Sequence, residues 1–203
     1  MSLRPIRVVK VGGSLFDLHD LPRRLRAWHD RQSPAQTVLI AGGGRFVDAL
    51  REIDRARPLG DKSAHWLAIS LMEVAAEVLA GWLPESRLAG GSLKTLLETS
   101  TPPREDGMLI FAPAHFLQNE EPNLPGRKLP ASWDVTGDSI SARVAIVAGA
   151  TELVLLKSSP PPVSRLAWCS DLKALANTGY IDPFFPLLAD ALPNFRFVDL
   201  RSS

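Results

Sequence analysis

The sequence predicts an α/β protein, a three-layer αβα sandwich around a mainly parallel sheet. Short β-branched apolar segments alternate along the chain with segments whose apolar residues recur at helical spacing, as strands and helices do when they follow one another in turn. The strand segments are apolar at almost every position, which is typical of parallel strands that helices cover on both faces. With 203 residues and no convincing linker, residues 1–203 are expected to form one domain.

The first two predicted strands both end in glycines. Residues 6–11 predict a buried strand that stops at Gly12-Gly13-Ser14, and residues 37–41 predict a second strand that stops at Gly42-Gly43-Gly44. A helix is expected after each glycine segment. The apolar residues that define these helices are Leu18, Leu21, Leu25 and Trp28 for the first, and Phe46, Val47, Leu50 and Ile53 for the second.

A third helix is predicted over about residues 62–83. Large apolar side chains are expected on its inward face, namely Trp66, Leu67, Leu71, Val74 and Val78. The remaining strands are expected at 108–112, 152–156 and 195–200, the remaining helices at 138–148 and 183–192, and proline-rich loops at 119–130 and 158–163.

Charge, cysteine content and hydropathy exclude several classes of protein. Lys and Arg total 23 against 22 Asp and Glu, a net charge of +1, so a strongly basic coat for nucleic acid is excluded and no nucleic-acid partner is expected. Cys169 is the only cysteine, which excludes an intramolecular disulfide and a cysteine zinc cluster. Because no apolar run approaches the roughly 18 residues of a membrane span and the amino terminus lacks a hydrophobic signal core, we expect a cytoplasmic protein without a membrane partner.

The two glycine segments predict an anion-binding site. Each lies between a buried strand and a helix, where unpaired N–H groups and the helix dipole favour negative charge. Glycines let the backbone approach an anion closely, and two such loops at one sheet edge would cradle a polyphosphate. A lone glycine pair is more often a tight turn. The P-loop pattern is absent, and Val47 breaks the dinucleotide-binding pattern that begins at Gly42.

Two lysines stand where predicted strands end. Lys10 lies inside an otherwise apolar strand, two positions before Gly12, and Lys157 directly follows residues 153–156. Each could be an edge lysine that snorkels to water. The functional alternative is a pair of cations held at the same sheet edge, facing a phosphate between them.

Three motifs, in chain order, resemble the amino acid kinase superfamily, which includes aspartate, glutamate, acetylglutamate, uridylate and isopentenyl phosphate kinases. They are Val8-Val-Lys-Val-Gly-Gly-Ser14, Ile40-Ala-Gly-Gly-Gly-Arg45 and Thr136-Gly-Asp-Ser-Ile-Ser-Ala142. The resemblance implies the αβα sandwich, phosphoryl transfer from Mg-ATP to a carboxylate, phosphate or similar acceptor, and a homodimer or higher homo-oligomer. Mg²⁺ would be held mainly through phosphates, so no protein metal ligand is expected.

The resemblance also implies roles for individual residues. Lys10 matches the lysine that contacts the transferring phosphoryl group, Asp138 matches the aspartate that orients the active-site lysines, and Lys157 is similar to a lysine that precedes the nucleotide lobe in some members. The phosphate-binding positions are Gly12, Gly13 and Ser14 in the first loop, and Gly42, Gly43 and Gly44 in the second, which also faces the acceptor.

A closer resemblance is to the short kinases of methanofuran biosynthesis, which phosphorylate an aminomethylfuran methyl phosphate to the diphosphate. Its segments are Asp61-Lys-Ser-Ala-His-Trp-Leu-Ala-Ile69, Ser132-Trp-Asp-Val-Thr-Gly-Asp-Ser-Ile140 and Tyr180-Ile-Asp-Pro-Phe-Phe-Pro186. It places Asp61 and His65 toward the acceptor. Without it, these two residues read as an exposed helix pair.

The sequence departs from the superfamily near its C-terminus. A Gly-Met-x-x-Lys segment that supplies a second lysine in many relatives is absent, and Ser158-Ser-Pro-Pro-Pro-Val163 stands where relatives carry Asp-Val-Asp-Gly-Val. These departures imply a lobe for acceptor and phosphate loops over about 1–150 and a reduced nucleotide lobe over about 151–203.

Several residues keep two interpretations. Asp138 also reads as a helix N-cap. Arg45 is a candidate clamp for an acceptor phosphate or a solvated arginine at a helix start. Trp133 reads as a core or loop anchor more readily than as a stacking platform.

Two functions follow from these features. One is a small-molecule kinase that transfers the γ-phosphoryl group of Mg-ATP to a phosphate or carboxylate acceptor. The alternative is a non-catalytic nucleotide- or oxyanion-binding protein on the same fold, with a regulatory or storage role. The missing C-terminal lysine segment favours the alternative, whereas Lys10, Asp138 and the two glycine loops favour the enzyme.

Overall fold

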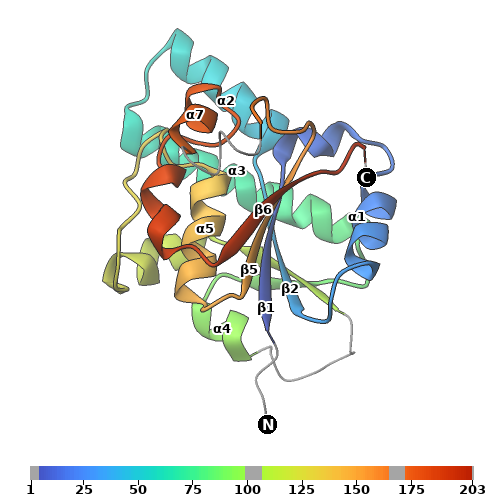
Figure 1. The fold of residues 1–203 in the computed structure, drawn as a ribbon. Coiled ribbons are helices and arrows are strands. Elements are labelled where there is room, and N and C mark those ends of the chain that lie inside the picture. The colour runs from blue at the N-terminus through green and yellow to red at the C-terminus, as the bar shows by residue number, and fades with distance from the viewer. Residues whose placement is uncertain (1–4, 99–106, 165–171, 203) are drawn as a thin grey trace.

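The computed structural model describes residues 5–98, 107–164 and 172–202. Six strands form one sheet in the order β3-β4-β2-β1-β5-β6, and every neighbouring pair is parallel (Figure 1). The predicted α/β fold is confirmed, and the sheet is wholly parallel among the described residues. The strands are β1 (Ile6–Val11), β2 (Gln36–Ala41), β3 (Arg87–Gly90), β4 (Met108–Ala112), β5 (Glu152–Lys157) and β6 (Asn194–Asp199).

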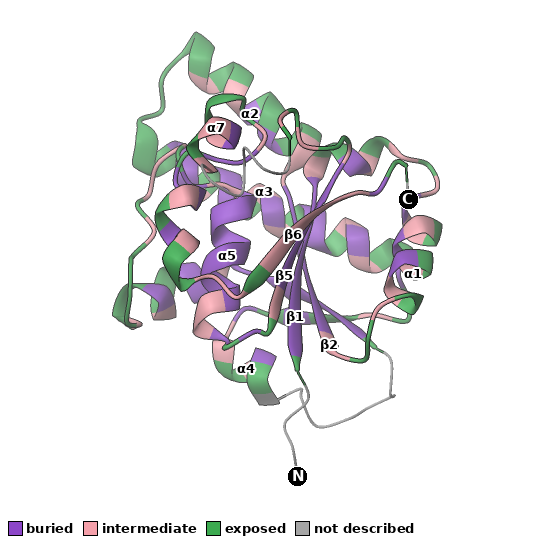
Figure 2. Ribbon diagram, in the orientation of Figure 1, coloured by how far each residue is buried: buried purple, intermediate pink, exposed green. Residues whose placement is uncertain are grey.

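Helices cover both faces of this sheet. They are α1 (Leu21–Asp30), α2 (Gly44–Ala56), α3 (Asp61–Trp82), α4 (Leu93–Glu98), α5 (Gly137–Val147) and α7 (Leu172–Asn177). Alternate residues of β1 enter different cores: Val8 packs with α5 on one face, and Val9 packs with α1 and the second half of α3 on the other. The central strands are therefore buried on both sides, as Figure 2 shows, and this accounts for their continuously apolar sequences.

The register places the glycine segments and both lysines at one edge of the sheet. Lys10 pairs with Ile40 of β2 and with Leu155 of β5, so these three strands end level with one another. Because the strands are parallel, Gly12, Gly42 and Lys157 all follow or lie at carboxyl ends on the same side. In open α/β sheets this edge is where ligands bind.

An ionic network lies at the end of the strands opposite the glycine loops. Glu152, at the start of β5, accepts from Arg7 Nε at 2.5 Å and from Arg196 Nε at 2.8 Å. Arg7 also donates to Ser33 Oγ at 3.0 Å. Burial raises the pKa of Glu152, but its hydrogen bonds from the two arginines outweigh this and the pKa lies below its usual value. The network ties β1, β5 and β6 together at the end remote from the glycines.

The predicted inward face of the third helix is wrong. Leu67 and Val74 are 46% and 42% exposed, and Trp66, Leu71 and Val78 are only partly buried. Half of the residues on the buried face are alanine: the face consists of Ala64, His65, Ala68, Ile69, Met72, Ala75, Ala76 and Leu79. This helix is apolar almost all round, so periodicity alone does not select a face, and small side chains let it lie close to the sheet and α2.

By length and composition α3 could cross a membrane, and it is the one helix in the described residues that passes this test. It contacts β2, β3, β4 and α2. These contacts explain the apolar character of α3, which packs as a core helix.

Other sequence expectations also need correction. On α2, Val47 and Leu50 are buried as expected, but Phe46 and Ile53 are 39% and 58% exposed. The 185–191 segment is a 3-10 helix, and short helical turns at 116–123 overlap the predicted loop 119–130. β3, α4 and α7 were not predicted, because the first two are short and α7 lacks a long apolar pattern. Cys169 lies outside the described residues.

Candidate active site

The two glycine loops touch each other at the carboxyl edge of the sheet. Gly12 N donates to Leu156 O and Gly42 N donates to Val11 O, each at 2.9 Å, so both loops begin anchored to a neighbouring strand end. A Cβ on Gly13 would lie 2.2 Å from Gly44 N, and Gly44 itself has φ +52°. Neither contact tolerates a side chain, so both positions require glycine for their backbone geometry.

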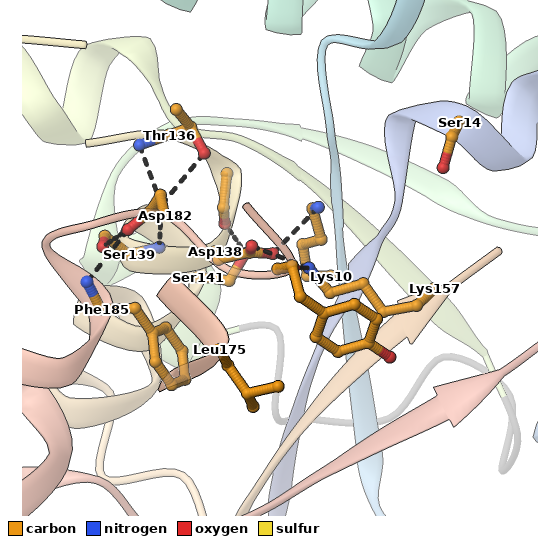
Figure 3. Close-up of polar contacts among 12 residues, drawn as sticks. Lys10, Ser14, Thr136, Asp138, Ser139, Ser141, Lys157, Leu175, Asp182 and Phe185 are labelled. Carbon is orange, nitrogen blue, oxygen red and sulfur yellow. Dashed lines mark hydrogen bonds and ion pairs between the residues drawn. The ribbon is translucent and has the colours of Figure 1, made fainter. Parts of the chain in front are cut away.

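Asp138 holds both lysines. Its Oδ1 forms an ion pair with Lys10 Nζ at 2.9 Å, and its Oδ2 accepts from Lys157 Nζ at 2.8 Å, as Figure 3 shows. Lys157 Nζ also donates to Tyr180 O at 2.6 Å and lies 5.0 Å from the centre of the Tyr180 ring. All three charged side chains are nearly buried, with relative exposures of 9%, 4% and 9% for Lys10, Asp138 and Lys157.

Burial and charge act in opposite directions on this cluster. Burial alone raises the pKa of Asp138, but the charges of Lys10 and Lys157 lower it to about 2. Burial, together with the neighbouring charge of Lys10, lowers the pKa of Lys157 to about 8, against the raising effect of Asp138. Asp138 is therefore ionised throughout the physiological range, and the proton on Lys157 is held less firmly than on a free lysine.

The alternative of a helix cap does not describe Asp138. The N-cap residue of α5 is Thr136, and Asp138 lies in the first turn with its carboxylate on the lysines. The first turn is capped from elsewhere in the chain by Asp182. Its Oδ2 accepts from Thr136 N at 3.0 Å and from Ser139 N at 2.9 Å.

A cavity of about 590 Å³ opens over this cluster. Its lining includes most of the residues selected from the sequence: Lys10, Gly12, Gly13, Ser14, Gly42, Gly43, Gly44, His65, Asp138 and Lys157. The structure thus brings together both glycine loops, both lysines and the aspartate. The volume is within the range of small-molecule sites.

Arg45 and Asp61 are placed differently. Neither is among the residues that line the cavity. The Arg45 side chain is 83% exposed and pairs with Asp17 at 2.8 Å, which matches the solvated alternative for this residue. Asp61 is exposed at the start of α3.

On the side of α2 and α3, the cavity wall contains Trp133, Arg51 and His65. Trp133 Nε1 donates to Asp54 Oδ2 at 2.9 Å, and the Arg51 guanidinium lies 5.1 Å from the centre of the Trp133 ring. His65 Nδ1 lies 3.1 Å from Ser132 O, and burial lowers the pKa of its imidazole. Trp133 is thus anchored in its loop, as expected, and also forms part of the wall.

The other part of the wall follows β5. Ser158 and Ser159 line it together with Tyr180. Ser14 Oγ lies 2.8 Å from Ser158 Oγ, which joins the first glycine loop to the segment after β5. Tyr180 Oη donates to Ser159 O at 2.9 Å. Burial, followed by the negative charges of Asp199 and Asp138, raises the pKa of this phenol, so it stays protonated.

Sequence reasoning missed Asp182 and Arg51 as members of the site. Asp182 lies in the segment Tyr180–Pro186, and no local pattern says that its partners lie on α5. Arg51 lies seven residues after Gly44, or about two helical turns into α2, a spacing that could have placed it on the same face as Gly44.

Comparison with known proteins assigns the family. The sequence profile described as "Amino acid kinase family" matches residues 5–161, which is more than half of the chain. The chain belongs to the amino acid kinase family. The match begins just before β1 and ends in the segment after β5, so it contains both glycine loops, Asp138 and both lysines.

The chain is 26% identical over 194 residues to [5-(aminomethyl)furan-3-yl]methyl phosphate kinase of Methanocaldococcus jannaschii, covering 90% of this chain and 82% of that protein. The crystal structure of UMP kinase from Bacillus anthracis matches with TM-score 0.66 and 13% identity, over 98% of this chain and 88% of that one. Uridylate kinase from Archaeoglobus fulgidus matches with TM-score 0.58 and 14% identity, over 91% and 85%. These two structures share the fold.

Family membership and site together identify an enzyme. The protein is a small-molecule kinase, and the non-catalytic alternative is not favoured. The lysines, the aspartate and the glycine loops lie in one cavity, as phosphoryl transfer requires.

Proposed function

We propose that this kinase transfers the γ-phosphoryl group of Mg-ATP to the phosphate of a small amine-bearing aromatic acceptor of the aminomethylfuran methyl phosphate type, giving a diphosphate. The observation that carries the proposal is the arrangement of Lys10 and Lys157 on the two oxygens of Asp138, beside two glycine loops. The acceptor chemistry comes from the name of the Methanocaldococcus jannaschii relative.

Phosphoryl transfer asks the protein to position two phosphates and to stabilise the charge that develops between them. Lys10 lies at the centre of the sheet edge, where its ammonium can bridge donor and acceptor oxygens. Lys157 lies beside Ser158 and Tyr180 and serves the donor side. Asp138 keeps both ammonium groups fixed before substrate arrives, so the site needs little rearrangement during reaction.

The glycine loops supply backbone N–H groups to phosphate oxygens. The loop Gly12–Ser14 serves the donor, and the loop Gly42–Gly44 lies between the donor and the acceptor. Their close approach leaves no room for side chains at Gly13 and Gly44, which keeps the backbone open to the phosphates.

The acceptor is assigned to the wall formed by α2, α3 and Trp133. The Trp133 and His65 rings offer flat surfaces to a furan-sized ring. Arg51 and Asp48 pair with each other at 2.9 Å, and on binding they would turn to the acceptor, the cation to its phosphate and the carboxylate to its ammonium group. Arg45 and Asp61 remain candidates only if a bound acceptor draws them toward the cavity.

Mg²⁺ fits this site as a companion of the nucleotide. No cluster of three or more His, Cys, Asp or Glu side chains that could hold a metal occurs in residues 5–98, 107–164 and 172–202. The buried carboxylates Asp138 and Asp182 are already engaged by lysines and by α5. The metal would neutralise phosphate charge while coordinated mainly by phosphate oxygens and water.

The remaining expectations for this protein are part of the same proposal. Residues 1–150 would form the acceptor and phosphate-loop lobe, and 151–203 a reduced nucleotide lobe. The protein would act in the cytoplasm, as a homodimer or higher homo-oligomer, without a nucleic-acid or membrane partner.

The test is ADP formation from Mg-ATP with [5-(aminomethyl)furan-3-yl]methyl phosphate, with product analysis by phosphorus NMR. We expect acceptor-dependent ADP and a new diphosphate signal, and a loss of about 100- to 1,000-fold in kcat for Lys10→Ala, the usual effect of removing one transition-state donor. Lys62→Ala is the matched control, because Lys62 is exposed and outside the cavity. The proposal would be contradicted if the wild-type protein formed ADP equally fast without the acceptor, or if Lys10→Ala kept full activity.

A further inference from the structure

A second buried carboxylate, Asp182, organises the catalytic cluster without touching either lysine through a direct bond. It follows α7 in the chain and is only 6% exposed. Oδ2 accepts from Thr136 N, Thr136 Oγ1 and Ser139 N at 3.0, 3.0 and 2.9 Å. Oδ1 accepts from Ser139 Oγ and from Phe185 N, the latter at 3.0 Å.

These bonds replace a local helix cap. The first N–H groups of any α-helix lack partners within the helix, and a side chain at the N-cap usually satisfies one of them. The N-cap of α5 is Thr136, which makes no side-chain cap bond of its own. Asp182 satisfies the first turn from 43 residues away in the sequence (Figure 3).

Because of this remote cap, the two carboxylates bind different partners. Asp138 lies in the same first turn, where an acidic side chain is well placed to satisfy backbone N–H groups. Because Asp182 already bonds Ser139 N, both oxygens of Asp138 are left for Lys10 and Lys157.

The segment that carries Asp182 also holds one of the lysines. Tyr180 O, two residues earlier, accepts from Lys157 Nζ at 2.6 Å. One short stretch of chain therefore fixes the aspartate through α5 and the lysine through a carbonyl. A shift of this stretch would move Asp138 and Lys157 relative to each other.

We propose that Asp182 is a positioning residue, whose carboxylate caps α5 from outside the helix and thereby holds Asp138 on the two lysines in a catalytically competent geometry. This inference rests on the proposed phosphoryl transfer. The residue has no role in the chemistry itself, because its oxygens are engaged by backbone and hydroxyl donors of the chain.

The titration of Lys157 offers a readout besides turnover. Lys157 faces Asp138, Lys10, Tyr180 and the charge of Asp182, and the last of these raises the pKa of the lysine. Burial and the charge of Asp138 in turn raise the pKa of Asp182. Neutralising Asp182 therefore lowers the pKa of Lys157 as well as loosening α5.

The experiment compares Asp182→Asn with Glu121→Gln. Glu121 is the matched control, because it is a buried carboxylate that bonds the same helix at Arg143 Nε, 2.9 Å away, outside the cavity. We expect Asp182→Asn to lower kcat about 10- to 100-fold, the range for a small misplacement of catalytic groups, with both KM values little changed. Glu121→Gln is expected to lower Tm while keeping wild-type kcat.

Two measurements on the folded protein need no turnover. NMR titration of the Lys157 ammonium should give a lower pKa in Asp182→Asn than in the wild type, and the Ser139 amide should exchange faster. Should Asp182→Asn fail to fold, Ser139→Ala removes one donor while leaving the charge, and is expected to lower kcat without changing KM.

The outcomes separate the two proposals. If the wild type shows no acceptor-dependent turnover, the proposed function fails, and the titration and exchange data still test Asp182. If turnover is present but Asp182→Asn matches Glu121→Gln in kcat, Asp182 is no more than a stabilising contact and the inference is overturned.

Discussion

Gly13 and Gly44 meet backbone to backbone, so the two glycine loops of this kinase form one structural unit. A Cβ on Gly13 would lie 2.2 Å from Gly44 N and 2.5 Å from Gly44 Cα, and a Cβ on Gly44 would lie 2.6 Å from Gly13 O. Backbone atoms on both sides cannot move away as a flexible side chain would. The spacing of the two loops is therefore set by the absence of side chains at these positions.

Gly13→Ala should separate the loops. We expect a fall of about 100-fold in kcat/KM, as for a displacement of about an ångström in a site that works by positioning, and a loss of about 1–3 kcal/mol in the free energy of unfolding from overpacking. Steady-state kinetics and urea unfolding measure the two effects.

The control for this substitution is Gly81→Ala. Gly81 lies in α3 and an added Cβ would meet nothing within 4 Å. The change is expected to stabilise the protein by about 0.5–1 kcal/mol and to leave kcat/KM unchanged. Equal behaviour of the two variants would mean that the contact between the loops is unimportant.

The pH dependence of the reaction should report Lys157. Burial lowers its pKa to about 8, so in the free enzyme the ammonium loses its proton as pH rises through this value. We expect kcat/KM to fall above pH about 8, and the limb in kcat to lie at higher pH because bound polyphosphate favours the charged lysine. Lys157→Arg, whose guanidinium stays protonated, should lose this limb, and a wild-type profile that stays flat to about pH 10 would count against the assignment.

Asp138→Asn and Lys157→Met should affect stability in opposite ways. Asp138→Asn leaves two lysines buried beside each other, and loss of one partner of a buried ion pair typically costs about 3–5 kcal/mol. Lys157→Met removes a charge that burial disfavours, so we expect a Tm at or above the wild-type value. Both variants should lose most of their turnover. Calorimetry at pH 7 checks the order, and a Lys157→Met protein that melts below Asp138→Asn would reverse the conclusion.

Acid provides an independent check on Asp138. Its folded pKa, about 2, lies below the unfolded value of 3.8, so the unfolded chain binds more protons between these values. The stabilisation is present above pH about 4 and is lost as pH falls toward 2. Unfolding followed from pH 5 to 2 should show a steeper loss for the wild type than for Asp138→Asn; parallel curves would be inconsistent with the low pKa.

The acceptor wall can be tested with arginines of one helix. Arg51 lies in the cavity wall against Trp133, whereas Arg55 is exposed and outside it. Arg51→Ala should raise the KM for the acceptor about 10- to 100-fold, as expected for a lost charged hydrogen bond, and leave the KM for ATP unchanged. Arg55→Ala is the control. If Arg45→Ala, and not Arg51→Ala, raised the KM for the acceptor, the acceptor phosphate would be assigned to Arg45, the residue indicated by the sequence.

The central strands and the two glycine loops could be predicted because their determinants are local. Each central strand is an almost continuous apolar run, and the runs of β1 and β2 stop at glycines. Lys10 stood out as a cation within such a run. Once the strands are known to be parallel, the position of Lys157 at the same edge follows from the topology.

What could not be predicted depends on contacts between distant segments. The buried face of α3 is decided by how closely the helix can approach the sheet, so Ala68 and Ala75 are buried while Leu67 is exposed. Asp182 caps a helix far from it in the chain. Arg51 lies against Trp133 in the cavity wall, and no spacing rule links these two residues.

The ionic network of Arg7, Glu152 and Arg196 ties three strands together at the end of the sheet opposite the glycine loops. These ion pairs add to the strand pairing at the end away from the candidate site. This makes the acceptor wall a suitable target for laboratory evolution: libraries at Asp48, Arg51 and Trp133 would sample new acceptors while the opposite end keeps the domain folded. Stabilising substitutions at that end, introduced first, would increase the number of library variants that still fold.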